Sequence, residues 1–186
     1  MPGRLEYAMR HGYSLIAVHE TYGHGISDGL HRIMRLIDEY DLVWGLDADC
    51  LITDHTRRIE DVPGLGPHVT VCEEGIIARN RFNCGAIVWR NTDGTRNLIH
   101  DVIASEPEWR NPSKCEFIWQ SWLAIHAERL GAWLTALPQR AFNSVAWDHS
   151  GGGNHWQPGD FVFHPCGVEH ARRLPLLERM CGEVVR

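Results

Sequence analysis

Residues 41–49 read DLVWGLDAD, an apolar run around one glycine that ends in Asp47 and Asp49. A short apolar run bounded by polar residues is typical of a buried strand, here predicted at 42–46. Open α/β sheets bind ligands beyond the carboxyl ends of their strands, which is where these carboxylates stand. Carboxylate oxygens suit Mg²⁺ or Mn²⁺, which commonly bridge to substrate phosphates. This DXD motif indicates a divalent-cation site; the alternative is an ordinary turn.

Length and composition limit the class of protein. The 186 residues suffice for one globular domain. A net charge of -6, with 18 Lys and Arg, argues against an extended nucleic-acid-binding face and favours a small anionic ligand. Six cysteines stand far apart without a Cys-x-x-Cys pair, so we expect buried thiols. No apolar run is long enough for a membrane span and residues 1–10 lack a signal-peptide core, so a cytoplasmic protein is expected; the oligomeric state is not indicated.

Apolar periodicity predicts alternating helices and strands. Helices are expected at 5–11, 28–40, 95–105 and 113–130, with a C-terminal helix running to about Met180, and strands at 14–19, 42–46, 68–72, 85–89, 132–137 and 161–164. The order of strand 14–19, helix 28–40 and strand 42–46 predicts a βαβ unit with parallel pairing. We therefore expect an α/β fold with a mixed, mostly parallel central sheet flanked by helices.

A second informative segment reads WQPGDFVFHPCG over residues 156–167. Its predicted strand ends in His164, and Gly167 follows where the backbone can pass close to a ligand. Asp47, Asp49 and His164 would supply two oxygens and one nitrogen at strand ends, leaving positions open for diphosphate oxygens and water. The alternative is a structural histidine at the end of a strand.

Five segments in the same order resemble glycosyltransferase family 34, the galactosyl-, xylosyl- and mannosyltransferases of fungi and plants. They are YAMRHGY at 7–13, LVWGLDADCLI at 42–52, NCGAIVWRN at 83–91, PQRAFNS at 138–144 and GDFVFH at 159–164. The resemblance implies a GT-A-like nucleotide-diphospho-sugar transferase fold. It also implies a metal-dependent, retaining glycosyltransferase that moves a hexose or pentose from a nucleotide-diphosphate sugar to a hydroxyl acceptor.

The resemblance assigns roles to the metal-binding side. It implies that Asp47 faces the ribose and the metal, that Asp49 binds the metal, and that His164 is the third protein ligand. The implied cofactor is Mn²⁺ or Mg²⁺, the donor is a UDP- or GDP-linked sugar, and the acceptor is a glycan or another hydroxyl compound. Residues 1–54 would form the nucleotide and metal side of a single domain spanning 1–186, and residues 68–186 the sugar and acceptor side.

On the sugar side, the resemblance implies that Asn83 and Gly85 sit beside the transferred sugar. Gln120 would contact the donor sugar from a helix. In the family one or two acids stand directly before this glutamine, whereas here the nearest acid is Glu116. Gln120 and Glu116 are therefore the catalytic candidates on this side.

Two further departures concern the diphosphate and the start of the chain. The family often carries a lysine after the metal-binding histidine, at the place of Glu169 here, so Arg172 or Arg173 would replace it beside Gly167. The family also has a first strand and loop before the helix at Tyr7, whereas this sequence begins almost on that helix, so we expect either an earlier start, a base site completed by another segment, or a degenerate relative.

Two other function classes remain open. A catalytically silent sugar-nucleotide or glycan-binding relative is consistent with the departures from the family pattern. A metallohydrolase could use the same Asp and His ligands, but it would leave the segments at 83–91 and 138–144 without a role.

Overall fold

The computed structural model describes residues 2–18, 25–77, 80–146, 153 and 155–184. The helices are α1 (Pro2–His11), α2 (Gly25–Glu39), α3 (Asp93–Ala104), α4 (Glu106–Trp109), α5 (Ile118–Ile125), α6 (Ala127–Leu130) and α7 (His170–Val184), with 3₁₀ turns η1 (Ile59–Asp61) and η2 (Gln139–Ala141). The strands are β1 (Leu42–Leu46), β2 (Leu51–Ile52), β3 (Val69–Ile77), β4 (Asn80–Arg90), β5 (Leu134–Pro138), β6 (Ser144–Val145) and β7 (Val162–His164).

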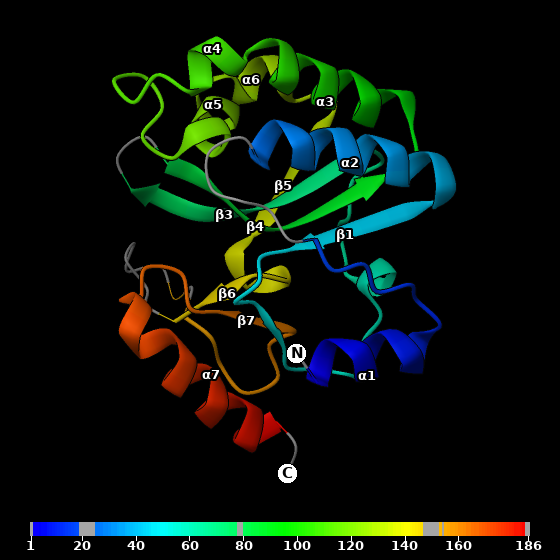
Figure 1. Ribbon diagram of the computed structural model, residues 1–186, viewed down its shortest axis with the longest axis vertical. Coiled ribbons are helices and arrows are strands. Elements are labelled where there is room, and N and C mark those ends of the chain that lie inside the picture. The colour runs from blue at the N-terminus through cyan, green and yellow to red at the C-terminus, as the bar shows by residue number, and fades with distance from the viewer. Residues whose placement is uncertain (1, 19–24, 78–79, 147–152, 154, 185–186) are drawn as a thin grey trace.

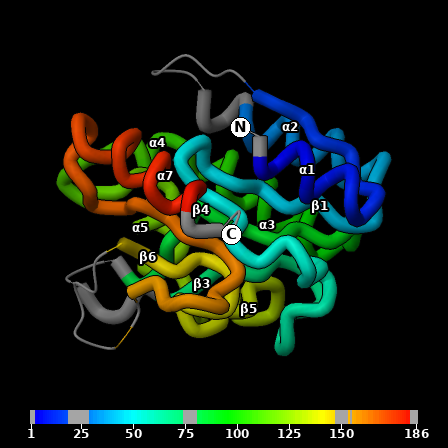
Figure 2. The backbone as a smooth tube through the Cα atoms, turned by 90° about the horizontal axis from the view of Figure 1, so that it is seen from below, coloured from blue at the N-terminus to red at the C-terminus, as the bar shows by residue number. Residues whose placement is uncertain are grey.

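The strands form two sheets, one of order β1-β4-β3-β5 and a smaller one of order β2-β7-β6. Helices α2 to α6 cover one face of the larger sheet, while the smaller sheet, α1 and α7 lie on its other side (Figure 1). Seen from that side, α1 and α7 stand in front of the sheet (Figure 2). The chain therefore crosses between two layers directly after β1, where the acidic motif lies.

Strand β4 separates two hydrophobic cores, because successive side chains of a strand point to opposite faces. Ile87 and Trp89 belong to the core under the helices, together with residues of α2, α3 and α5. Ala86 and Val88 belong to the second core, which includes Tyr7 of α1. Packing on both faces therefore holds β4 in place, next to the turn that follows β1.

The predicted α/β architecture with a mixed sheet flanked by helices is confirmed. Strands β1, β3 and β5 share one direction and β4 runs opposite to them between β1 and β3, so only β3 and β5 pair in parallel within the larger sheet. The predicted βαβ unit implies more parallel pairing, and the strands predicted at 68–72 and 85–89 are shorter than those observed. In the structure, β3 extends to Ile77 and β4 begins at Asn80. A connection this short allows two consecutive strands to pair only in antiparallel orientation.

The predicted strand at 14–19 is wrong over its described part. Residues 14–18 form no strand, and Leu15, Ile16 and Val18 are at least 40 % exposed; His19 lies outside the described residues. The predicted βαβ unit is therefore wrong, and β1 pairs antiparallel with β4 instead. An apolar run becomes a strand only where a neighbour accepts its backbone hydrogen bonds, which sequence periodicity does not report.

The helix predicted at 113–130 is shorter than expected. It begins at Ile118, whose φ of 54° lies in the left-handed region, and it breaks at His126 before α6. Across the described part of the chain, no helix is long and apolar enough to cross a membrane.

Candidate functional site

Asp47 and Asp49 stand on the turn that follows β1. The Asp47 amide donates to Gly85 O of β4 at 2.7 Å, and the Cys50 amide donates to Asp47 O at 3.0 Å. From α1, the Arg4 guanidinium donates to Asp47 O and, at 2.6 Å, to Cys50 O. Hydrogen bonds with both layers therefore hold the turn, and they fix the backbone positions of Asp47 and Asp49.

His164 ends β7, which pairs with β2 on one side and β6 on the other. Its Nε2 lies 3.6 Å from Asp49 Oδ1 and 3.8 Å from Asp47 Oδ2, and only 5 % of its side chain is exposed. Its Nδ1 lies 3.0 Å from Oδ1 of Asn143. The structure thus brings together the three residues that the sequence analysis predicted as metal ligands.

Gly85 makes room for the imidazole. A Cβ at this position would lie 2.1 Å from Cε1 of His164 and 2.6 Å from its Nδ1, which is closer than atoms can approach. The ring therefore occupies the place of the absent side chain. Gly85 was predicted to sit beside the transferred sugar; here its missing side chain seats His164.

The electrostatics of the site favour a neutral histidine. Burial lowers the pKa of His164 to about 4, with Arg173 and Arg4 adding to this and Asp49 opposing it. Loss of bulk water and the adjacent Asp49 raise the pKa of Asp47 to about 6, although 60 % of its side chain is accessible, so solvent limits this rise. At neutral pH the site therefore offers carboxylate oxygens and an uncharged imidazole, which are the forms that bind metal ions.

Cys50 is a neighbour of this cluster that the sequence analysis did not consider as a ligand. One ligand atom from each of Asp49, Cys50 and His164 lies within 4.8 Å of the others. The thiol is buried and donates to Gly85 O at 3.3 Å. Burial and the nearby carboxylates raise its pKa well above the usual range, so it stays protonated at neutral pH. The oxygen and nitrogen ligands therefore suit Mg²⁺ or Mn²⁺ better than a thiolate-binding metal.

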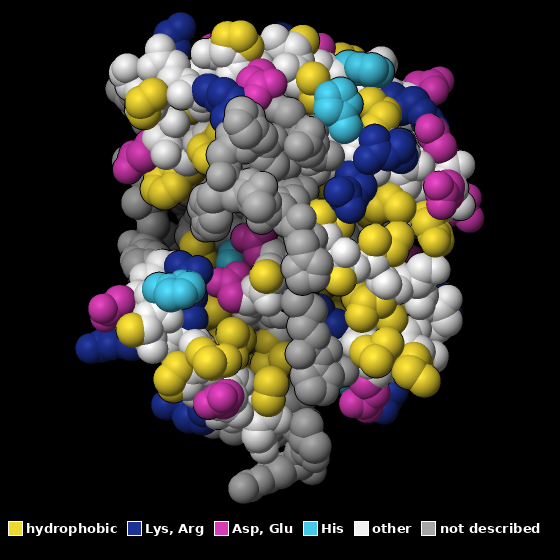
Figure 3. Space-filling model, viewed as in Figure 1, with side chains coloured by type: hydrophobic (Ala, Val, Ile, Leu, Met, Phe, Trp, Pro, Cys, Tyr) yellow, Lys and Arg dark blue, Asp and Glu magenta, His cyan; other side chains and the backbone are white. Residues whose placement is uncertain are grey.

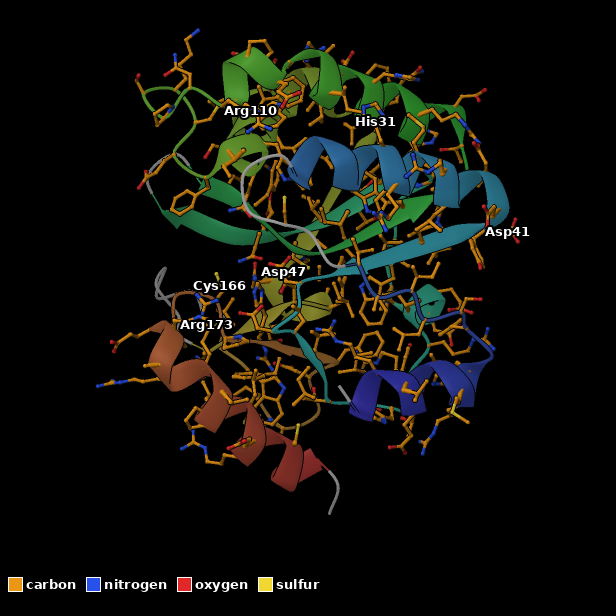
Figure 4. All side chains as sticks on the ribbon, in the orientation of Figure 1. His31, Asp41, Asp47, Arg110, Cys166 and Arg173 are labelled. Atoms are coloured by element: carbon orange, nitrogen blue, oxygen red, sulfur yellow. The ribbon has the colours of Figure 1, made fainter. Side chains whose placement is uncertain are left out.

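Of the two adjacent arginines on α7, Arg173 reaches the cluster and Arg172 does not. Arg173 Nη1 donates to Asp49 Oδ2 at 2.9 Å, and its Nε donates to Val168 O at 2.8 Å. Arg172 has a 78 % exposed side chain and pairs with Glu169. Figure 4 shows Arg173 and Asp47 facing the same space between the layers, and Figure 3 shows acidic, basic and histidine side chains in a recess there. Of the two arginines proposed from the sequence, Arg173 is placed to meet an anion bound at this recess.

The residues predicted beside the sugar lie on β4 and at the start of α5. Asn83 is buried, and its Oδ1 accepts from the Gly85 amide at 3.0 Å and from Asn143 Nδ2 at 2.9 Å. Gln120 Oε1 accepts from the Cys84 amide at 2.7 Å, so it joins α5 to the same segment of β4. Through these hydrogen bonds, the side chains of Asn83 and Gln120 stabilise the local structure at the edge of the site.

Glu116 and Gly167 lie on two connecting segments, before α5 and before α7. Glu116 is exposed on the segment before α5. Gly167 has a φ of 74° in the turn between β7 and α7, a conformation that favours glycine. This turn directs the chain into α7 and so sets where Arg173 emerges.

Comparison with known structures identifies the fold. A glycosyltransferase involved in glycosylation of the major capsid of PBCV-1 superposes with a TM-score of 0.71 at 16 % identity, over 96 % of this chain and 89 % of that one. The chain has the GT-A fold. The galactosyltransferase LgtC, solved with donor and acceptor sugar analogs, gives a TM-score of 0.48 at 17 % identity over 96 % and 72 % of the two chains. No protein-family model matches the sequence, and neither does any curated protein.

Within the GT-A fold, two site residues had no role assigned from sequence. Cys50 directly follows the acidic motif, so its position was the available signal. Asn143 lies in the segment 138–144, but nothing local indicates that its side chain reaches His164 on another strand. At 16 % identity the structural likeness establishes the fold alone, so the chemistry depends on the residues of the site.

Proposed function

We propose that this chain is a metal-dependent, retaining glycosyltransferase that moves a hexose or pentose from a UDP- or GDP-linked sugar to a hydroxyl acceptor. One observation carries the proposal: Asp47, Asp49 and the neutral His164 converge in a recess that also receives Arg173. Such a set of groups suits a cation and the diphosphate that it would bind. The GT-A fold and the resemblance to family 34 favour a nucleotide-sugar donor.

Asp47, Asp49 and His164 would hold Mn²⁺ or Mg²⁺. The chemistry of the donor set fits either ion, and the ring seated on Gly85 aims its free nitrogen at the carboxylates. When bound, the cation would act as a Lewis acid for the negative charge that develops on the departing diphosphate.

Arg173 would meet the diphosphate oxygens. Its guanidinium is already at the recess, and a planar guanidinium can offer two parallel hydrogen bonds to a phosphate. It would fill the role of the lysine that the family often carries at the position of Glu169. The positive charge of Arg4, which is fixed on the turn, adds to the anion-attracting field.

The sugar would lie along the Asn83–Gly85 segment next to α5. Glu116 is exposed before α5 rather than buried against this segment. Same-face attack therefore suits the site better than a covalent intermediate on Glu116: the acceptor oxygen bonds to the anomeric carbon as the diphosphate leaves, and the leaving phosphate oxygen takes the acceptor proton. The capsid glycosylation attributed to the PBCV-1 enzyme supports a glycan or another hydroxyl acceptor.

A catalytically silent sugar-nucleotide or glycan-binding protein is the second candidate. The buried side chain of Asn83 is committed to Gly85, Asn143 and Cys166, so it offers little to a sugar. Arg173 also neutralises Asp49 in the free protein. A binding protein would keep these features without turnover.

The test incubates the purified protein with Mn²⁺ and a panel of UDP- and GDP-sugars and measures released nucleotide. The proposal expects release by the wild type, loss in Asp49→Ala and retention in Asp101→Ala, whose aspartate pairs with Arg129 at the surface. Tight donor binding without release would establish the binding protein instead. Cleavage of phosphoesters that carry no sugar would indicate a metallohydrolase.

A further inference from the structure

We propose that Asn143 is a positioning residue that holds His164 as the Nδ1–H tautomer, so that the lone pair of Nε2 faces Asp47 and Asp49. The inference rests on the proposed function, because a cation is what this lone pair would bind. A neutral imidazole carries one proton, and only its unprotonated nitrogen can bind a metal ion. Which nitrogen that is depends on the hydrogen bond made by the other one.

The orientation of the Asn143 amide follows from two backbone groups that have no choice of role. The Gly85 amide can only donate, and it donates to Asn83 Oδ1 at 3.0 Å. The Asn83 carbonyl can only accept. The Asn143 side-chain atom facing both Asn83 O at 3.2 Å and Asn83 Oδ1 at 2.9 Å must therefore be the NH₂ nitrogen.

With the nitrogen of Asn143 assigned, its oxygen is the atom that faces His164. Oδ1 lies 3.0 Å from Nδ1, and an amide oxygen can only accept, so Nδ1 carries the proton. Nε2 is then unprotonated, 3.6 Å from the nearest oxygen of Asp49 and 3.8 Å from that of Asp47. Backbone chemistry on β4 thus dictates the tautomer of a side chain on β7.

This arrangement opposes what the carboxylates alone would favour. Without a cation, Asp47 and Asp49 attract a proton to Nε2, because an Nε2–H would donate towards them. Asn143 favours the opposite tautomer from a fully buried position, where an unpaired Nδ1 or amide group would be costly. Asn143 therefore keeps the site ready for a cation before one arrives.

Asn143 is itself held in place by Gln139. The Asn143 amide donates to Gln139 O at 3.1 Å, and Gln139 Nε2 donates back to Asn143 O at 2.6 Å. Both residues are fully buried. These two hydrogen bonds fix the backbone of Asn143, while its side-chain amide is held by Asn83 and His164.

The test measures the imidazole nitrogen shifts of ¹⁵N-histidine-labelled, metal-free protein by NMR, with His164→Gln identifying the His164 signals. The wild type is expected to show protonated Nδ1 and unprotonated Nε2. Asn143→Ala is expected to move the proton towards Nε2 and to weaken Mn²⁺ binding by about 10- to 100-fold. Ser144→Ala, a change at the adjacent buried residue, should leave the tautomer and the Mn²⁺ affinity unaltered.

A wild-type spectrum with the proton on Nε2 would overturn the inference, and this measurement needs no variant of Asn143 to fold. An unchanged tautomer or unchanged Mn²⁺ affinity in folded Asn143→Ala would overturn it as well. Absence of nucleotide release with the expected tautomer and Mn²⁺ affinities would instead reject the proposed transferase and leave the positioning role supported.

Discussion

Arg173 of α7 donates from Nη1 to Oδ2 of Asp49 at 2.9 Å, although the two residues are 124 positions apart. The guanidinium thus neutralises one proposed metal ligand in the free protein. A cation at the site would compete for the same carboxylate, and Arg173 would then be released towards the phosphates that arrive with the donor. Arg173 therefore has opposite expected effects on the cation and on the nucleotide.

Replacing Arg173 by alanine should separate these effects. Mn²⁺ alone should bind Arg173→Ala as tightly as the wild type or more tightly, because a competing positive charge is gone. UDP in the presence of Mn²⁺ should bind about 10- to 100-fold more weakly, since a hydrogen bond between charged groups contributes about 1.5–3 kcal/mol. Titration calorimetry measures both. Arg172→Ala is the matched control, because this exposed side chain pairs only with Glu169 among the contacts described; an equal loss of UDP affinity in both variants would contradict the assignment.

Gly85→Ala should damage the metal site through His164. The new methyl would overlap the imidazole, with 2.1 Å to Cε1 and 3.0 Å to Nε2, so the ring has to leave its place. We expect a destabilisation of about 1–3 kcal/mol, typical of overpacking, and at least about tenfold weaker Mn²⁺ binding. Gly45→Ala is the control within the paired strand β1, where the nearest atom would lie at an ordinary 3.6 Å. Equal Mn²⁺ affinity of Gly85→Ala and the wild type would show that His164 is not a ligand.

Mn²⁺ binding should weaken as the pH falls through about 6. The pKa of Asp47 is raised to about 6, so its carboxylate is free for a cation above that pH and is increasingly protonated below it. Affinity should fall towards tenfold per pH unit once Asp47 binds the competing proton. Manganese titrations between pH 5 and 8, followed by electron paramagnetic resonance, measure this. Asp47→Asn should bind more weakly at pH 8 and lose this pH dependence; a wild-type affinity that stays flat down to pH 5 would exclude Asp47 as a ligand.

Asp160 should contribute stability that is lost in acid. Burial raises its pKa, but hydrogen bonds from Arg140, the Gln157 amide and Ser144 outweigh this and lower the pKa below 3.8. Because the folded-state pKa is the lower one, the contribution is present above the unfolded-state value and disappears as the pH falls through the folded-state value. Asp160→Asn should lower the free energy of unfolding at pH 7 by about 1–3 kcal/mol.

Urea unfolding at pH 7 and near pH 3 measures this effect. The difference between wild type and Asp160→Asn should narrow at the acidic pH. Asp101→Asn, which breaks an exposed pair with Arg129, should change stability by less than about 1 kcal/mol at either pH. A difference for Asp160→Asn that is equally large at both pH values would show that the charge of Asp160 is not what stabilises the fold.

Local sequence patterns predicted most elements because they follow from properties of neighbouring residues. The apolar run before Asp47 is a strand, and the predicted helices at 28–40 and 95–105 are observed within a few residues as α2 and α3. The strand prediction at 14–19 is wrong over its described residues, because no strand lies beside this apolar run to pair with its backbone. The sheet is less parallel than expected because β3 and β4 extend towards each other, and no single residue signals that extension.

The candidate site was also predictable only in part from the sequence. The identity of Asp47, Asp49 and His164 as possible ligands follows from carboxylates and an imidazole at the ends of apolar runs, which is information carried by short segments. Their meeting depends on the pairing of β7 with β2 and on the turn after β1 being fastened to β4, which are contacts between distant parts of the chain. The chemical types of the ligands could therefore be read from the chain, whereas their distances could not.

The roles of Arg173 and Asn143 could not be predicted from the sequence, because they depend on tertiary contacts. Two adjacent arginines are equivalent by composition, and only the direction in which each leaves α7 separates the one on Asp49 from the one in solvent. The proton position on His164 follows from an amide on one connection and a backbone carbonyl on another strand. Hydrogen bonds are short and directional, so they depend on the packed positions of segments that are far apart in the chain.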